Sequence, residues 1–343
     1  WYSNNSMGIV FWMFSSLALP VLQSAKILTL KIVCDKLLGD KEMINFLQRE
    51  RYDITILDAF NPCSFILAQK LGVRYVAFFP GTLNGPLSIA LPSPVSYIPV
   101  FGSQLSDHMN LWARAKNLFY SVLELVWSKF REVAERHLES GSPAGGLSKL
   151  HQEADLWAFN TDFSLEFPQP LMPYTVLVGG LLNKPAKPLE QDLELWISGF
   201  GEAGFIVVTL GSMVSSISVD PLLVEMMAGF SRITQGVLWR YDSQRWPPHL
   251  DRPPNLRLVD WLPINDLLGH KKARLFITHG GQNSLLQAVY HAVPVLGIPL
   301  FGDQFDNAVR AETKGLGLTI SPTNITGGLL KSQKNSVVAL RVL

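Results

Sequence analysis

The sequence predicts an α/β protein built from two doubly wound domains, each a parallel sheet with helices on both faces. Short β-branched runs alternate with stretches of helical spacing along most of the chain, which is the pattern of a parallel sheet. A stretch rich in Lys and Pro within residues 181–200 interrupts this alternation and is typical of an exposed linker. The length of 343 residues suits two domains of roughly 150 residues each.

The first predicted domain covers residues 1–180. Its run 9–22 is highly apolar, but it contains Ser and Pro and is shorter than the roughly 20 residues that span a bilayer, so a buried helix is expected there. A Pro-rich segment at 86–99 breaks the periodicity. The remaining pattern predicts helices over 31–50, 65–71 and about 107–138, and strands over 52–57, 73–79, 156–160 and 175–178.

The second predicted domain covers residues 201–343, after the linker at 181–200. The same alternation restarts there, so two Rossmann-like domains are expected to face each other across a cleft. Strands are predicted at 205–210, 237–239, 256–259, 275–278 and 293–298, and helices at 221–233, 282–291 and 304–314.

Composition excludes several classes of protein. With 48% apolar and 17% charged residues, the chain is not of the disordered class. A net charge of +1 provides no basic stripe, so no nucleic-acid partner is expected. Cys34 and Cys63 are too few for a disulfide framework and do not fix the redox compartment. No clustering of Cys and His predicts a metal site.

Ligands of open parallel sheets bind beyond the carboxyl ends of the strands, so the loops after strands are the candidate sites. In the segment 278–284 a predicted strand runs into two glycines and then into a helix that opens with Asn and Ser. Amides at such a helix start, together with the helix dipole, favour phosphate, and His279 adds a donor. We favour this anion site over an ordinary capped turn. No G-x-G-x-x-G follows a strand, which argues against a nicotinamide enzyme.

Three further loops carry suitable side chains. Ser212 follows Gly211 after a strand, although a tight turn with a capping serine is the more common meaning of that pattern. Trp261 lies at a strand end close to a proline, where its ring can stack on a base. Asp303 and Gln304 can hold sugar hydroxyls, with a helix N-cap as an equally supported role for Asp303. Together these loops make up the inventory of a nucleotide-sugar site.

The segment 261–307 resembles the signature of the animal UDP-glycosyltransferases, which include the UDP-glucuronosyltransferases. Within that family the chain is most similar to the UDP-glycosyltransferase 3 branch, which transfers sugars such as N-acetylglucosamine, glucose or xylose. The resemblance implies a GT-B fold with an amino-terminal acceptor-binding domain and a carboxy-terminal donor-binding domain. It extends through Asn61-Pro62-Cys63, Tyr97-Ile98-Pro99-Val100, Ser106-Asp107-His108-Met109, Val178-Gly179-Gly180 and Thr209-Leu210-Gly211-Ser212-Met213.

The resemblance also implies a role for each donor-site residue. Trp261 is expected to stack on uracil, and Asp303 and Gln304 to bind the transferred sugar. The family has Gln at the position of Ile264. At the position of Gln287 it has a Glu that holds the ribose hydroxyls, and Gln287 can keep these hydrogen bonds without charge assistance. The diphosphate is expected to contact Ser212, Thr278, His279, Asn283 and Ser284.

For catalysis the family uses a histidine base that an aspartate orients, and Asp58 matches that aspartate. The strand that bears the histidine is expected before Trp1, so the base is expected to lie outside this chain. His108, His137 and His151 do not match its motif and are expected to be surface or helix-face residues. The resemblance fades after residue 320, before the donor-domain end and the membrane anchor of the family.

The expected reaction is inverting transfer of a hexose or related sugar from a UDP-sugar to a hydroxyl of a small lipophilic acceptor. The alternative is an inactive truncated isoform that binds UDP or full-length partners. No cofactor is expected beyond the UDP-sugar co-substrate. A full-length relative is expected on the lumenal side of the endoplasmic reticulum membrane, in oligomers with itself or related transferases, whereas this chain is expected to lack the targeting signal and the anchor.

Overall fold

The computed structural model describes residues 34–83, 92–138, 146–211, 224, 226, 228–246 and 248–322. It divides into two compact units, one within residues 1–78 and 128–156 and a larger one within 79–127 and 157–343. The apolar run 9–22 and most of the helix predicted at 221–233 lie outside the described residues. The domain limits predicted at 180 and 201 stay a prediction.

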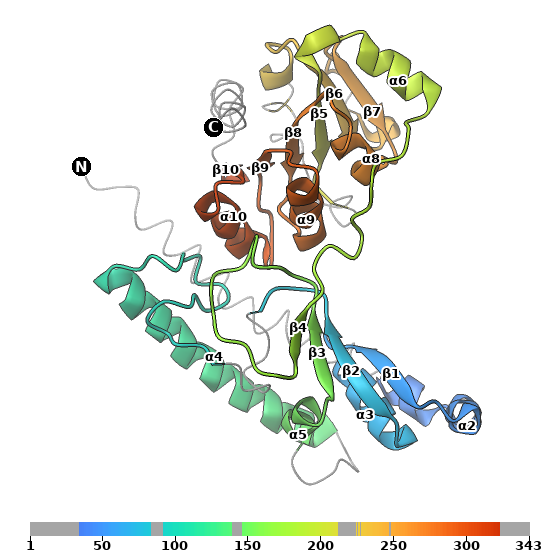
Figure 1. Cartoon of the computed structure of the whole chain (residues 1–343), viewed down its shortest axis with the longest axis vertical. Helices are drawn as coiled ribbons and strands as arrows, with labels where there is room; N and C mark the ends of the chain where they lie inside the picture. The colour runs from blue at the N-terminus through green and yellow to red at the C-terminus, as the bar shows by residue number, and fades with distance from the viewer. Residues whose placement is uncertain are drawn as a thin grey trace. The chain divides into compact units, whose positions relative to one another are not determined.

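The first sheet has four strands in the order β1-β2-β3-β4 (Figure 1). The β1–β2 pair is parallel and runs in register from Ile54↔Arg74 to Asp58↔Phe78; the β3–β4 pair is also parallel. The strands are β1 (Ile54–Asp58), β2 (Arg74–Phe79), β3 (Leu156–Phe159) and β4 (Thr175–Leu177), and the helices in these parts of the chain are α2 (Lys41–Glu50), α3 (Pro62–Leu71), α4 (Leu111–Leu138) and α5 (Gly146–Gln152).

Capping explains where the first helices begin. The single helix predicted at 31–50 is interrupted at Asp40, whose Oδ1 accepts a hydrogen bond from the Met43 N–H at 2.9 Å and starts α2. Asn61 caps α3 in the same way through the Cys63 N–H at 3.1 Å, and Pro62 occupies the first turn. Gly72, at a φ of 66°, ends α3 in the left-handed conformation.

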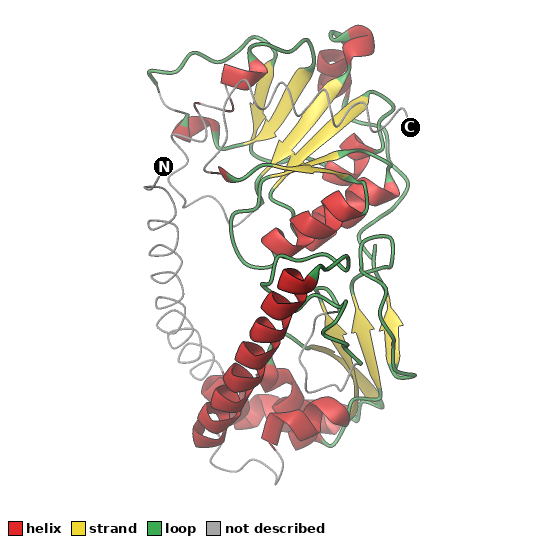
Figure 2. Ribbon diagram, turned by 90° about the vertical axis from the view of Figure 1, so that its left-hand side faces the viewer, coloured by secondary structure: helices red, strands yellow, loops and turns green. Residues whose placement is uncertain are grey.

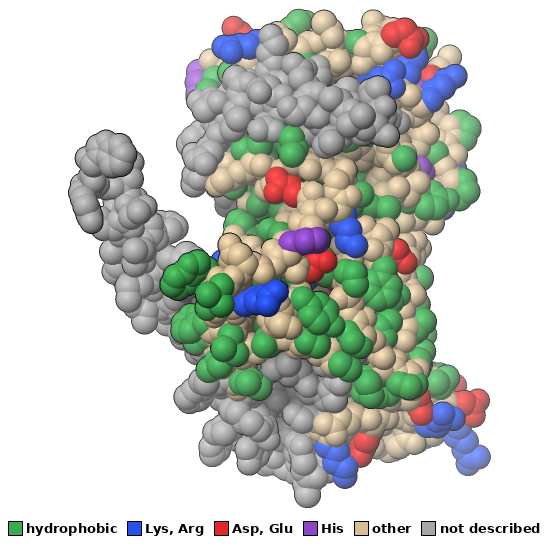
Figure 3. Space-filling model, turned by 60° about the vertical axis from the view of Figure 1, so that its left-hand side comes forward, with side chains coloured by type: hydrophobic (Ala, Val, Ile, Leu, Met, Phe, Trp, Pro, Cys, Tyr) green, Lys and Arg blue, Asp and Glu red, His purple; other side chains and the backbone are tan. Residues whose placement is uncertain are grey.

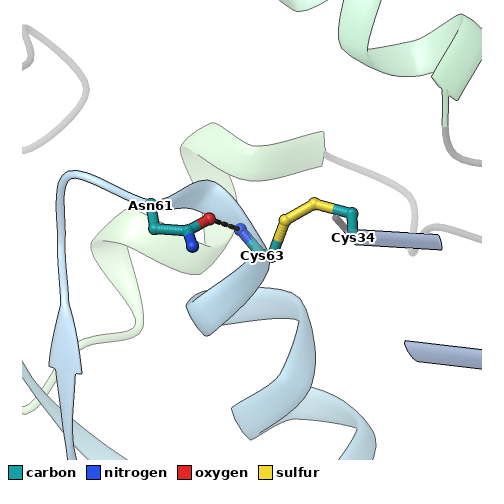
Figure 4. The surroundings of a disulfide bond; sticks show 3 residues. All are labelled: Cys34, Asn61 and Cys63. Atoms are coloured by element: carbon teal, nitrogen blue, oxygen red, sulfur yellow. Dashed lines mark hydrogen bonds between the residues drawn. A yellow bond between two sulfur atoms is a disulfide. The ribbon is translucent and has the colours of Figure 1, made fainter. Parts of the chain in front are cut away.

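Cys34 and Cys63 form a disulfide with their Cα atoms 5.5 Å apart (Figure 4). Cys34 belongs to residues 34–39, which are helical, and Cys63 is completely buried at the start of α3. The bond therefore ties the helical turn at 34–39 to the first turn of α3, close to the carboxyl end of β1. Two cysteines alone did not predict this pairing.

The first half of α4 exposes large apolar side chains. They recur at helical spacing, so they form a stripe along the helix. Figure 3 shows hydrophobic side chains gathered on one face of the molecule. The exposed members on this part of α4 are Leu111, Trp112, Leu118, Phe119, Val122, Leu123 and Leu125. Among the described residues, no helix combines the length and the apolar character needed to cross a membrane.

The second sheet has six parallel strands in the order β10-β9-β8-β5-β6-β7 (Figure 1). Figure 2 shows its strands side by side with helices packed next to them. The strands are β5 (Phe205–Thr209), β6 (Gly236–Arg240), β7 (Leu256–Val259), β8 (Ala273–Thr278), β9 (Val295–Gly297) and β10 (Gly317–Thr319). The helices are α6 (Gln191–Ser198), α8 (Ile264–Leu268), α9 (Gln282–Tyr290) and α10 (Gln304–Thr313), with short 3-10 turns η2 (Gly201–Ala203) and η4 (Ser243–Arg245).

The core of this sheet lies on both of its faces. Successive residues of a strand point to opposite faces, and β5 shows this directly. Ile206 and Val208 belong to one buried cluster, whereas Phe205 and Val207 belong to another. A central parallel strand that is covered on both sides has to be apolar throughout, which is why β5 was predictable from its sequence.

The second half of the segment 181–200, which was predicted as a linker, carries a helix. Residues 191–198 form α6, whose Leu193 and Ile197 are buried in the core of the second sheet. The first half also makes specific contacts: the Lys184 N–H donates to Asn265 Oδ1 at 3.2 Å, and the Lys187 N–H donates to Asp266 Oδ1 at 3.1 Å. The segment is therefore attached to α8 rather than exposed along its whole length.

Candidate functional site

The topology of the second sheet places a crevice between β5 and β8. From β5 the chain moves outward to β6 and β7, then returns to the other side of β5 as β8 and continues to β9 and β10. Loops that leave adjacent strands in opposite directions open a crevice at such a switch point, and ligands bind there. The β5–β8 pairing ends at Thr209↔Thr278, so the two loops start side by side.

His279 lies in a slot between two glycines from these loops. A Cβ on Gly211 would come within 2.8 Å of His279 Nε2, and a Cβ on Gly281 within 2.7 Å of the same atom. Gly211 also has a φ of 89°, which a residue with a side chain rarely adopts. On the other edge of the ring, Nδ1 lies 3.3 Å from Thr278 Oγ1. The imidazole therefore has a fixed place in the crevice.

Electrostatics keep the imidazole neutral near neutral pH. Burial lowers the pKa of His279 from its usual value of 6.5, and the charge of Asp303 and a hydrogen bond with the Thr209 backbone raise it in part. A neutral imidazole donates one N–H. An anion placed against it would raise its pKa and add a proton.

The start of α9 adds backbone donors. Gly281 is the N-cap residue, and no side-chain hydrogen bond caps this described helix. Its first-turn N–H groups therefore remain for a ligand, and the helix dipole favours an anion there. Asn283 is exposed in the first turn and its Oδ1 accepts from Asn160 Nδ2 at 2.7 Å, whereas Ser284 and Gln287 are half-buried further along the helix.

Asp303 and Gln304 lie at the start of α10, and their environments differ. Asp303 is at the N-cap position but makes no cap hydrogen bond; instead its Oδ2 accepts from Asn307 Nδ2 at 2.7 Å. Gln304 is only 3% exposed, and its Oε1 accepts from the N–H groups of Leu300 at 2.8 Å and Phe301 at 3.0 Å. The Gln304 oxygen thus holds the loop before α10, so a contact with sugar would fall to its amide nitrogen.

Trp261 lies two residues after β7 with an exposed indole ring. Its side chain is 74% exposed, and the Arg240 guanidinium lies 5.0 Å from the ring centroid. Arg240 Nε also donates to the Asp260 carbonyl at 3.2 Å, which holds the cation beside the ring. Ile264 begins α8 and packs against the core cluster of the sheet, so it makes an apolar contact where the family has Gln.

The remaining predicted residues are spread over the chain. Ser212 lies outside the described residues, as does the side chain of His137. Asp58 ends β1 with an exposed carboxylate that accepts from the Phe60 N–H at 2.9 Å. His108 is exposed and lies 2.9 Å from Asp107 Oδ1, as expected of a surface residue. His151 is on α5 but buried, with its ring 4.5 Å from that of Phe65, so only its helix-face placement was right.

Sequence reasoning missed a buried polar set on α10. Asp306, Asn307 and Arg310 are all buried, whereas the sequence pattern predicted only a helix over 304–314. Asp306 Oδ1 accepts from the Gln104 N–H at 2.9 Å, and its Oδ2 accepts from the Gly102 N–H. Burial raises the pKa of Asp306, while the two N–H groups and Arg310 lower it in part. Polar residues at the inward positions of α10 are the signal that could have revealed this set.

Among the described residues, no group of three or more His, Cys, Asp or Glu side chains could hold a metal ion. A sequence profile of the family described as "UDP-glucoronosyl and UDP-glucosyl transferase" matches residues 1–339. The chain belongs to the UDP-glycosyltransferase family.

Relatives of known name support the branch of this UDP-glycosyltransferase. UDP-glucuronosyltransferase 3A1 of Bos taurus is 43% identical over 310 residues, which are 89% of this chain and 59% of the relative. UDP-glucuronosyltransferase 3A1 of Homo sapiens is 42% identical over 90% of this chain and 62% of its own length. A 2-hydroxyacylsphingosine 1-beta-galactosyltransferase of Mus musculus is 39% identical over 87% of this chain and 55% of its own length. The chain thus spans about three fifths of these relatives, and the predicted UDP-glycosyltransferase 3 branch is supported.

Solved glycosyltransferases confirm the fold of this UDP-glycosyltransferase. The glycotransferase of kitacinnamycin aligns with a TM-score of 0.63 at 16% identity, over 94% of this chain and 76% of that one. The calicheamicin glycosyltransferase CalG4 aligns with a TM-score of 0.58 at 18% identity, over 91% of this chain and 70% of that one. The predicted GT-B fold, with two parallel α/β sheets, is confirmed.

Proposed function

We propose that this chain binds a UDP-sugar in the crevice beyond β5 and β8, and that its enzyme transfers the sugar with inversion to a hydroxyl of a small lipophilic acceptor. The observation that carries the proposal is the His279 slot between Gly211 and Gly281, directly beside the uncapped start of α9. Both groups offer N–H donors, and both favour an anion.

The charges of the site support one orientation of the donor. The diphosphate fits against the His279 imidazole and the first turn of α9, where the helix dipole contributes partial positive charge. Asp303 is close enough to His279 to influence its pKa, yet its carboxylate would repel a phosphate. The same carboxylate accepts hydrogen bonds from hydroxyl groups. The sugar is therefore proposed to lie toward Asp303 and Gln304, with the uracil stacked on Trp261.

The diphosphate contact can be tested by calorimetry with UDP and with uridine. His279→Ala is expected to weaken UDP binding about 10- to 100-fold, the value of one hydrogen bond to a charged group, and to leave uridine binding nearly unchanged. His108→Ala, which removes an exposed histidine, is the matched control and is expected to bind both ligands like the parent chain. Equal losses for UDP and uridine would mean that His279 is structural.

Two observations support the proposed transfer to a lipophilic acceptor: the position of Asp58 and the name of a relative. We propose that Asp58 orients a histidine base, because its exposed carboxylate at the end of β1 can accept an imidazole N–H. The mouse galactosyltransferase relative is named for 2-hydroxyacylsphingosine, a lipid, and this supports a lipophilic acceptor. The test is transfer of labelled sugar from several UDP-sugars to a panel of phenols, steroids and ceramides, with a family-like first strand that carries the histidine joined ahead of the chain. UDP binding without transfer to any of them would favour the inactive alternative.

We also propose that the chain works in an oxidising compartment, such as the lumen of the endoplasmic reticulum. The Cys34–Cys63 disulfide supports this, since such bonds persist in secretory compartments and are rare in the cytosol. Alkylation of the protein from isolated microsomes, before and after reduction, tests the proposal. We expect both cysteines to be protected from alkylation until they are reduced, and labelling without reduction would contradict it.

A further inference from the structure

A buried ion pair connects α10 with the segment that follows β3. Glu166 Oε2 lies 3.3 Å from Arg310 Nε, and each side chain is only 2% exposed. Both residues belong to the larger unit. The guanidinium also lies 5.8 Å from the centroid of the Phe167 ring, a cation–π contact. Neither residue is part of the donor site proposed above.

One arm of the pair reaches the sugar end of the proposed site. Arg310 Nη1 donates to Asn307 Oδ1 at 3.3 Å. Asn307 is fully buried, and its Nδ2 donates both to Asp303 Oδ2 at 2.7 Å and to the Gly280 carbonyl at 3.1 Å. The Asn307 amide therefore fixes one carboxylate oxygen of Asp303 with respect to the loop that carries His279.

The other arm reaches the diphosphate end. Glu166 Oε1 accepts from Thr161 Oγ1 at 2.8 Å and from the Leu83 N–H at 3.1 Å. Thr161 Oγ1 in turn accepts from Gln282 Nε2 at 2.8 Å. Gln282 is the first residue of α9, next to the N-cap Gly281. One arm thus ends at the start of α10 and the other at the start of α9.

The chemistry of the guanidinium sets the direction of this network. A guanidinium only donates hydrogen bonds, so the amide oxygen of Asn307 has to face Arg310. The amide nitrogen is then turned toward Asp303, where a donor is needed to hold a carboxylate. Glu166 makes it feasible to bury the charge of Arg310, because an unpaired cation there would be very costly.

Stability alone is a weak reason for this pair. Taking two charges out of water costs much of what their attraction returns, and apolar replacements of buried ion pairs are often neutral or stabilising. We propose that Glu166 and Arg310 are positioning residues that, through Asn307, orient the Asp303 carboxylate toward the hydroxyls of the donor sugar. This inference rests on the proposed function, since it concerns the sugar end of the same site. It predicts an effect on the sugar and not on the UDP portion of the donor.

The experiment compares UDP with UDP-glucose by calorimetry on the full chain. The double variant Glu166→Gln with Arg310→Met removes both charges and keeps an oxygen at position 166 that can accept from Thr161 Oγ1 and the Leu83 N–H, so the arm toward α9 is retained. We expect its UDP affinity to stay within about twofold and its Kd ratio of UDP-glucose to UDP to rise about tenfold, the scale of one lost hydrogen bond. Glu312→Gln, on the same helix but with its carboxylate on the Thr319 N–H, is the control and is expected to keep the parent ratio.

Asn307→Asp provides a second route if the double variant does not fold. It keeps the size of the side chain and an acceptor for Arg310, but replaces the N–H donors that face Asp303 by an oxygen, so the Kd ratio is expected to rise at least as much. A parent chain that does not bind UDP would defeat the proposed function itself. If the parent binds UDP, an unchanged Kd ratio in the variants would overturn only the positioning role. Equal losses for UDP and UDP-glucose would overturn it too, because they indicate a merely structural role.

Discussion

Gly281→Ala is the sharpest test of the His279 slot, because it moves the ring without straining the backbone. Gly281 has a φ of −62° and a ψ of 143°, which any residue adopts. Its added Cβ would lie 2.7 Å from His279 Nε2, whereas ordinary contact begins at 3.4 Å, so the ring has to move by about 0.7 Å (3.4 − 2.7). Alanine is also a poorer N-cap than glycine, by about 0.5 to 1 kcal/mol of stability.

That displacement is enough to break a hydrogen bond. A donor about 2.9 Å from a phosphate oxygen would come to lie about 3.6 Å away, outside hydrogen-bonding distance. Because a hydrogen bond to a charged group contributes about 1.5 to 3 kcal/mol, we expect UDP-glucose to bind about 10- to 100-fold more weakly. The midpoint of thermal unfolding should fall by only a few degrees.

Calorimetry with UDP-glucose, combined with a double-mutant cycle, separates the ring movement from other effects. In a His279→Ala background, Gly281→Ala should cause almost no further loss, since there is no imidazole left to displace. Gly39→Ala is the control, because a Cβ at Gly39 meets nothing within 4 Å. Unchanged affinity in Gly281→Ala, or the same loss with and without His279, would refute the reasoning.

Three further expectations concern other parts of the chain. Burial lowers the pKa of His279 below 6.5 in the free protein, whereas a bound diphosphate raises it. UDP-glucose should therefore bind more tightly as the pH falls, by up to about tenfold per pH unit between the pKa of the free and that of the bound state. In calorimetry, the affinity of His279→Ala should not change with pH. Trp261→Ala should weaken uridine binding by about 1 to 3 kcal/mol through lost stacking, and equal affinity in a titration would remove Trp261 from the site. Cys63→Ser removes the Cys34–Cys63 bond, which spans 29 residues, and should lower the free energy of unfolding by about 3 to 4 kcal/mol in a denaturant titration. An unchanged free energy of unfolding would mean that the disulfide does not restrict the unfolded chain.

Several strands of the second sheet were predictable from their local sequence pattern. The strand predicted at 256–259 has the bounds of β7, and the predictions for β5 and β8 are displaced by only one or two residues at an end. Because β8 ends where a loop must begin, the segment 278–284, at which the anion site is proposed, could also be placed after a strand. The three-residue edge strand β10 was missed, because so short a segment carries no usable period.

Contacts between distant residues could not be predicted. Glu166 and Arg310 are 144 positions apart (310 − 166), and neither has a local pattern that points to the other. Gln304 shows the same limit at short range: its position after a strand suggested a sugar ligand, whereas its oxygen bonds to two N–H groups of its own loop. A sequence indicates which side chains can do chemistry, but the partners they choose depend on the packing.

The Cys34–Cys63 bond has a consequence for how the chain is made. Both cysteines lie within the same short stretch, and 29 positions separate them, whereas the smaller unit also needs residues from 128–156. Synthesis proceeds from the amino end at about 5 to 20 residues per second, so both thiols emerge several seconds before that later segment exists. In the oxidising compartment proposed above, an oxidase can thus join the turn at 34–39 to α3 while the ribosome is still translating, and α5 then arrives at a piece of chain that is already closed.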